Sequence, residues 1–153
     1  MNIGIDIDDT IIETAEFVTP RLSEFLSPNK DASKNNPFPS DPRLAADKAR
    51  VMIFNKEAFE KIMSEIPPKP DAKKIIGKLK AEGHKIIIIT ARDESVYKGA
   101  FEFSSCQLKK LGIEYDKLFC SFDKRKICAE EKIDLFIDDS VENLQMVKGA
   151  VKK

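Results

Sequence analysis

Residues 3–12 read Ile-Gly-Ile-Asp-Ile-Asp-Asp-Thr-Ile-Ile, and this stretch decides the fold. An apolar run ends in carboxylates here, which is typical of a short buried strand that reaches the edge of a sheet. Because side chains alternate along an extended chain, a strand over residues 3–8 would turn Asp6 and Asp8 to the same side. Two crowded carboxylates repel each other, so the pair predicts a cation between them, a shared proton, or both.

Aspartate also favours turns and helix N-caps, so this cluster alone fits a plain strand end as well. However, a second apolar run ends in Asp138 and Asp139, and a third ends in Thr90, followed by Ala91 and Arg92. In an open parallel sheet, ligands bind outside the carboxyl ends of the strands. We therefore expect all three sets to meet at one edge. Phosphoryl chemistry needs this arrangement: one carboxylate to attack, one to handle a proton, and a hard metal between them.

The composition narrows the function classes. The chain has 153 residues, with 26 basic and 26 acidic side chains, so its net charge gives no argument for nucleic acid or a membrane surface as a partner. No apolar stretch approaches the roughly 20 residues that span a bilayer, and the first residues lack a signal-peptide pattern. We therefore expect a cytoplasmic protein. A single histidine, His84, and three cysteines without CxxC spacing argue against a zinc centre, a disulfide framework and a Ser/His/Asp triad.

From residue 71 onward, strand-like and helix-like segments alternate. This alternation predicts an α/β fold with a parallel sheet and right-handed crossovers. Asp71 is expected to cap the first of these helices, and Gly83 and Gly112 are expected to end two of them. The predicted elements are helix 71–80, strand 85–90, helix 95–111, strand 118–120, helix 124–132, strand 134–137 and helix 141–149.

An insertion separates the first strand from this alternation. Residues 13–25 and 44–66 have helical spacing, Pro20 predicts a break or a kink, and the segment between the two helices is rich in turn residues. We expect a core of residues 1–10 and 71–153 and a small helical cap of residues 11–70 over the strand ends. The alternative is that these helices only cover a sheet face. The candidate pocket residues of the cap are Phe17, Arg43, Phe54 and Phe59, although aromatic residues at helical spacing more often belong to a core.

Four segments together resemble the motifs of the haloacid dehalogenase (HAD) superfamily of phosphohydrolases. Asp6-Ile7-Asp8-Asp9-Thr10 resembles its first motif, Thr90 its second, Lys124 its third, and Asp138-Asp139 its fourth. They occur in the family's order and cover nearly the whole chain. The resemblance implies a three-layer Rossmann-like core with a parallel sheet and a cap inserted after strand one.

The position of the cap and the Ile-Asp-Asp form of the fourth motif are similar to the C1-capped group related to 5′(3′)-deoxyribonucleotidases. Thr90-Ala91-Arg92 departs from the Thr-Ser-Pro form of the true deoxyribonucleotidases. The substrate therefore stays open among nucleoside monophosphates, sugar phosphates and other small phosphomonoesters.

The resemblance also implies residue roles. Asp6 would be the nucleophile that forms an aspartyl-phosphate, and Asp8 the general acid and base. Thr90 and Lys124 would bind the phosphoryl group. Mg²⁺ is the implied cofactor, held by Asp6, the backbone carbonyl of Asp8 and Asp139, with Asp138 in the first or second shell. The oxygen-rich donor set favours Mg²⁺ on chemical grounds as well.

Several alternatives remain at this stage. Lys126 competes with Lys124 for the phosphate role, and Thr10 would brace the loop or contact substrate. Arg92 could contact phosphate or substrate, or could pair with Asp93. A receiver-like regulatory protein and a catalytically silent phosphate-binding and Mg²⁺-binding module are the rival functions, and a homodimer is left open.

Overall fold

The computed structural model describes residues 1–26, 61–95 and 98–152, and residues 22–26 by their backbone alone. These residues fall into two compact units. One combines Met1–Glu13 with Pro67–Lys153, and the other is Thr14–Ile66. Within the described ranges, no helix combines the length and apolar character needed to cross a membrane.

The larger unit is built on a four-stranded parallel sheet with the order β3-β2-β1-β4. Its strands are β1 (Asn2–Ile5), β2 (Lys85–Thr90), β3 (Lys117–Cys120) and β4 (Leu135–Ile137). The first strand of the chain therefore lies inside the sheet, paired with β2 on one side and with β4 on the other. The predicted α/β fold with a parallel sheet is confirmed.

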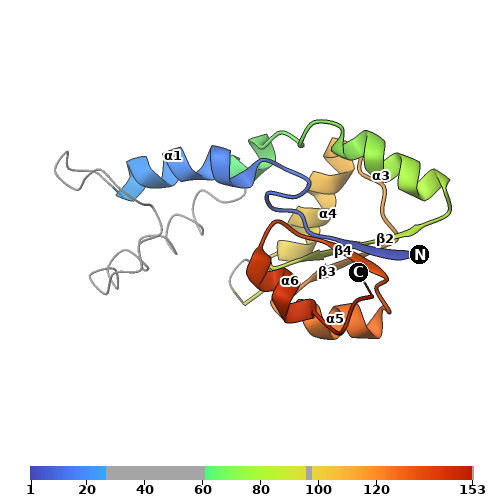
Figure 1. The fold of residues 1–153 in the computed structure, drawn as a ribbon. Coiled ribbons are helices and arrows are strands. Elements are labelled where there is room, and N and C mark those ends of the chain that lie inside the picture. The colour runs from blue at the N-terminus through green and yellow to red at the C-terminus, as the bar shows by residue number, and fades with distance from the viewer. Residues whose placement is uncertain (27–60, 96–97, 153) are drawn as a thin grey trace. The chain divides into compact units, whose positions relative to one another are not determined.

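Helices cover both faces of this sheet (Figure 1). Helices α3 (Ala72–Ala81) and α4 (Ala100–Leu111) lie on one face, and α5 (Lys124–Glu130) and α6 (Val141–Val147) lie on the other. Local signals fix several ends. Asp123 accepts a hydrogen bond from the backbone of Lys126, Ser140 accepts one from Asn143, and Gly112 ends α4 at a φ of 67°.

Burial on both faces explains the composition of the strands. Ile86, Ile87, Ile88 and Ile89 of β2 are each 0% exposed, as expected for a central parallel strand. Gly4 of β1 allows a close approach, because an added Cβ would lie 2.7 Å from the ring of Phe136 in β4. One core cluster between the sheet and helices α5 and α6 comprises Ile87, Ile89, Ile127, Cys128, Ile133, Phe136 and Val147.

The predicted extent of the first strand is wrong. Strand β1 ends at Ile5, and the chain then turns. The carbonyl oxygen of Ile7 accepts hydrogen bonds from the backbone of Thr10 at 3.3 Å and of Ile11 at 2.8 Å. Asp9 adopts a φ of 53°, a left-handed conformation that aspartate tolerates better than most residues. Strand alternation therefore does not decide where the Asp8 side chain points.

Other local predictions also need correction. Asp71 stands at the N-cap of α3 but has a φ of 62° and makes no side-chain capping hydrogen bond. Pro20 lies inside the single helix α1 (Thr14–Leu26), so the helix is not broken there, and a kink was the other expectation. Helix α4 begins at Ala100, five residues later than the predicted start at residue 95. Of the second predicted cap helix, residues 61–65 are helical, and residues 44–60 lie outside the described residues.

Candidate active site

The order of the strands marks a place for a ligand. The chain moves from β1 outward to β2 and β3 and then returns to place β4 on the opposite side of β1. In open α/β sheets, ligands bind at such a reversal, outside the carboxyl ends of the strands. Asp6 follows β1 directly, and Asp138 and Asp139 follow β4 directly. The backbone N–H of Asp6 still donates to the carbonyl of Ile137 at 3.0 Å, which holds the two strand ends together.

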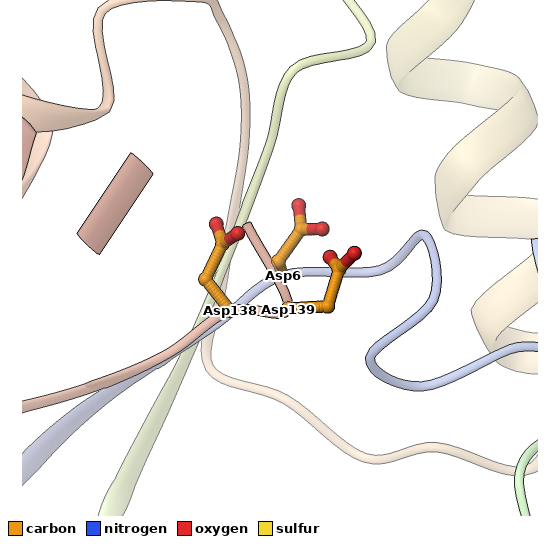
Figure 2. Close-up of side chains that lie close together, drawn as sticks. All are labelled: Asp6, Asp138 and Asp139. Atoms are coloured by element: carbon orange, nitrogen blue, oxygen red, sulfur yellow. The ribbon is translucent and has the colours of Figure 1, made fainter. Parts of the chain in front are cut away.

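Three carboxylates gather at this point. Asp6, Asp138 and Asp139 each offer an oxygen, and the three oxygens lie within 4.8 Å of one another. Figure 2 shows the three side chains projecting from the adjacent strand ends toward the same side. Asp6 and Asp138 are buried, whereas Asp139 is exposed. Oxygen donors at this spacing fit a hard divalent cation such as Mg²⁺, with Asp139 on the accessible side.

A buried lysine joins two of these carboxylates. Lys124 is 1% exposed, and its Nζ lies 2.8 Å from Asp6 Oδ1 and 2.7 Å from Asp138 Oδ2. Lys124 begins α5, so the cap at Asp123 fixes the place from which the side chain reaches the site. The competing Lys126 is solvent-exposed and pairs with Glu130 on the same helix at 3.9 Å. The geometry therefore separates the two lysines and brings Lys124 to the carboxylates.

Burial and neighbouring charges have opposing effects on the pKa values of this cluster. Burial raises the pKa of Asp6 to about 7 against the opposing effect of Lys124, and the charges of Asp8 and Asp138 add to the rise. Burial also opposes the charge of Lys124, but the carboxylates of Asp6 and Asp138 prevail and raise the pKa of the lysine. Desolvation and the neighbouring Asp138 raise the pKa of Asp139. One lysine thus leaves excess negative charge, which a divalent cation would offset.

Asp138 and Asp139 differ in their hydrogen bonds within the protein and in their exposure. Asp138 Oδ1 accepts hydrogen bonds from the backbone N–H of Ser140 and from Asn143 Nδ2, both at 2.9 Å. Its Oδ2 accepts from Lys124 and, at 3.1 Å, from Asn143 again. These contacts fit Asp138 to hold Lys124 in place. The exposed Asp139 is better placed to offer an oxygen to a bound ion.

Asp8 faces a different cation. Arg92 Nε donates to Asp8 Oδ2 at 2.9 Å, and Arg92 Nη2 donates to Asp8 Oδ1 at 2.8 Å, so the pair is bidentate. The arginine side chain is 2% exposed and that of Asp8 is 32% exposed. The partners expected for Arg92 from sequence were phosphate, substrate or Asp93, and Asp8 was not among them.

The two threonines occupy distinct positions. Thr90 is the last residue of β2 and is 0% exposed, and its hydroxyl accepts a long hydrogen bond of 3.4 Å from the backbone of Arg92. The hydroxyl of Thr10 is buried and has no hydrogen-bond partner among the described residues. A buried hydroxyl without a partner is costly, and a bound ligand is one way to satisfy it.

One of the candidate pocket residues of the cap, Phe17, is described within the smaller unit. Arg21 lies over the ring of Phe17, 5.0 Å from its centroid, within the smaller unit. The other cap candidates, Arg43, Phe54 and Phe59, lie outside the described residues.

Sequence reasoning missed three supporting residues. Asn143 holds Asp138, and Ser104 and Gln107 hold Arg92. A signal for the last two was present. They are polar residues three positions apart on the face of α4 that also carries Ala100 and Leu108, where apolar side chains are expected.

No protein-family model and no curated protein sequence matches the chain. A solved structure does: a HAD-superfamily hydrolase from Ehrlichia chaffeensis superimposes with a TM-score of 0.58 at 15% sequence identity. The match covers 98% of this chain and 83% of that protein. At such low identity the likeness concerns the backbone. The chain therefore has the α/β fold of this HAD-superfamily hydrolase. In the present chain, Asp6, Asp138, Asp139 and Lys124 lie together at the carboxyl edge of the sheet.

Proposed function

We propose that the protein is a Mg²⁺-dependent phosphomonoester hydrolase that acts through an aspartyl-phosphate on Asp6. The observation that carries the proposal is the buried Lys124, which bridges Asp6 and Asp138 beside Asp139 at the reversal point of the sheet. Burying three charges is expensive, and such a group is a candidate for chemistry. The fold shared with a HAD-superfamily hydrolase supports the same proposal.

In the first half of the proposed reaction, an Asp6 oxygen attacks phosphorus and the bond from phosphorus to the leaving oxygen breaks. Asp8 gives its proton to the leaving oxygen. Lys124 lies 2.8 Å from Asp6, so its charge holds the nucleophile in place and faces the transferring phosphoryl group. Thr90, at the end of β2, would donate its hydroxyl to a phosphate oxygen.

In the second half, Asp8 takes a proton from water. The water oxygen bonds to phosphorus, the bond to Asp6 breaks, and inorganic phosphate leaves. The donor set of Asp6, Asp139 and the Asp8 carbonyl would hold Mg²⁺. The ion, when bound, would offset the repulsion between the carboxylates and the substrate phosphate.

For the substrate we propose a small phosphorylated metabolite, with nucleoside monophosphates as the leading class. The support is the sequence resemblance to the C1-capped nucleotidase-like group. We also propose that Thr14–Ile66, a separate compact unit, is the cap of that architecture.

The test is phosphate release with and without Mg²⁺ from 4-nitrophenyl phosphate, ribo- and deoxyribonucleoside monophosphates and sugar phosphates. Asp6→Asn should abolish release. Asp134→Asn is the matched control, because Asp134 accepts a hydrogen bond from the backbone of Asn2 at the opposite end of the sheet. Release that persists in Asp6→Asn would rule out the covalent route. Stable phosphorylation of Asp6 without turnover, detected by mass spectrometry, would indicate a regulatory protein instead.

A further inference from the structure

The ion pair between Arg92 and Asp8 is supported from behind by helix α4. Arg92 Nη1 donates to Gln107 Oε1 at 2.7 Å and to Ser104 Oγ at 3.4 Å. The ring of Phe103 lies 5.7 Å from the guanidinium carbon. The guanidinium therefore binds Asp8 along one edge and α4 along another, which fixes its plane.

These contacts explain why two polar side chains of α4, Ser104 and Gln107, are buried. Ser104 is 0% exposed and Gln107 is 5% exposed. Polar side chains in such positions cost stability unless they are hydrogen-bonded. Here both accept hydrogen bonds from the same arginine, so Arg92 satisfies these two buried polar groups of α4.

The pair is also placed for the reaction. Asp8 and Arg92 come from the loops after β1 and β2, the two strands whose ends carry Asp6 and Thr90. All three guanidinium nitrogens, Nε, Nη1 and Nη2, donate to side chains of the protein itself. In this structure Arg92 thus holds a carboxylate of the protein, Asp8.

We propose that Arg92 is a positioning residue for Asp8, held in place by Ser104 and Gln107. The inference rests on the proposed phosphomonoesterase function. When the proton leaves Asp8 for the leaving oxygen, negative charge develops on the Asp8 carboxylate. The two hydrogen bonds from Arg92 stabilise that charge and keep the carboxylate oriented for the later proton transfer from water.

The role predicts a dependence on the leaving group. A poor leaving group needs its oxygen protonated as the bond to phosphorus breaks, whereas 4-nitrophenolate leaves without a proton. Loss of Asp8 positioning should therefore slow substrates with basic leaving groups most. Arg92→Lys is the sharpest variant, because lysine keeps the charge but cannot form the bidentate pair.

The experiment measures kcat/KM for a series of phenyl phosphates substituted with 4-nitro, 3-nitro, 4-chloro and hydrogen, in wild type and variants. For Arg92→Lys we expect a loss of about 100-fold with phenyl phosphate and less than about 5-fold with 4-nitrophenyl phosphate. Gln107→Met removes one acceptor from Arg92 and should show the same trend with a smaller loss. Thermal melting checks that each variant is folded. If Arg92→Lys does not fold, the comparison of esters is made with Gln107→Met.

Two further variants complete the test. Arg125→Lys is the matched control, because Arg125 donates 2.8 Å hydrogen bonds to the carbonyls of Met146 and Lys148, away from the site, and should leave the trend unchanged. Asp8→Asn should give the steepest dependence of kcat/KM on the leaving group. Adding Arg92→Lys to Asp8→Asn should lower kcat/KM little further, because Arg92 acts through Asp8.

The outcomes separate this inference from the proposed function. A wild-type protein that hydrolyses none of the esters would overturn both. A wild-type protein that is active, with Arg92→Lys and Gln107→Met losing equal factors on every ester, would overturn the positioning role alone. A full additional loss in the double variant would do so as well, because Arg92 would then act independently of Asp8.

Discussion

Aspartates stand at both ends of the parallel sheet, and they behave in opposite ways. At the amino end, Asp116 and Asp134 precede β3 and β4, and each accepts a hydrogen bond from the backbone N–H of a neighbouring strand, from Ile86 at 2.7 Å and from Asn2 at 2.8 Å. Each also pairs with a lysine, Lys80 and Lys152 respectively.

The pKa values follow the surroundings. The hydrogen bond from Lys152, with that from Asn2, lowers the pKa of Asp134. Partial burial opposes the shift at Asp116, but the hydrogen bonds from Lys80 and Ile86 prevail and lower its pKa. At the carboxyl end the pKa values of Asp6 and Asp139 are raised. The amino end uses aspartate to stabilise strands, whereas the carboxyl end crowds charges at a cost, an arrangement typical of functional sites.

The largest effect on stability is expected for Lys124→Met. Removing the lysine leaves the buried Asp6 and Asp138 without their cation, and breaking a buried ion pair typically costs about 3 kcal/mol or more. The matched control is Lys117→Met, at the amino end, where Lys117 pairs with Glu131 and its side chain is 44% exposed. Because the Lys117 end of this pair is exposed to water, the loss should be less than about 1 kcal/mol. Urea unfolding of both variants measures the difference, and equal losses would contradict the contrast between the two ends.

A second effect concerns metal affinity. Asp139→Ala removes the exposed carboxylate of the cluster and should weaken Mg²⁺ binding about tenfold or more, as measured by calorimetry. Asp134→Ala serves as the control and should bind Mg²⁺ as the wild type does. If Asp139→Ala bound the ion unchanged, Asp139 would not be a ligand.

The third prediction concerns the change of stability with pH, which should have opposite signs for the aspartates at the two ends of the sheet. Because the folded-state pKa of Asp6 is about 7 and the ordinary value is 3.8, the metal-free protein should lose stability as the pH rises between these values. Asp6→Asn has no such ionisation, so with chelator present it should melt a few degrees above wild type at pH 8. The gain should vanish near pH 4. A lower melting temperature at pH 8 would show that the Lys124 pair outweighs the crowding.

The smallest effect is expected at the amino end. Asp116→Asn weakens the hydrogen bonds to Lys80 and Ile86 and should lower stability by about 1 kcal/mol at pH 7 without changing turnover. Because the folded-state pKa of Asp116 is lowered below 3.8, its contribution is present above that pH. The difference between variant and wild type should therefore shrink as the pH falls below 3.8, which denaturant titrations at several pH values can follow.

The sequence predicted the parts of this molecule that depend on local pattern. Apolar runs ending in polar residues located the strands and predicted that Asp6 and Asp138 meet, because parallel strands present their carboxyl ends at a common edge. Lys124 was expected there only from the family resemblance, and its contacts with both carboxylates place it beside them. The same reasoning placed Asp8 on β1, and that was wrong, since the chain turns after Ile5. A turn with Asp9 in the left-handed region leaves no periodic signal.

Contacts between residues far apart in the sequence could not be predicted from it. Arg92 contacts Asp8 across 84 positions of the sequence. Such contacts depend on how loops after separate strands come together. Polar residues on the inward face of α4, Ser104 and Gln107, were the available hint that a buried charge lay nearby.

The inside position of β1 has a consequence for synthesis. The ribosome makes this strand before both of its partners, because β2 begins at Lys85 and β4 at Leu135. Until β4 emerges, one side of β1 has no strand to pair with, and exposed strand edges invite aggregation in nascent chains. The completion of the sheet and the arrival of Asp138 beside Asp6 are thus one event. A nascent chain should gain protection of β1 and the capacity to bind a divalent cation at the same chain length.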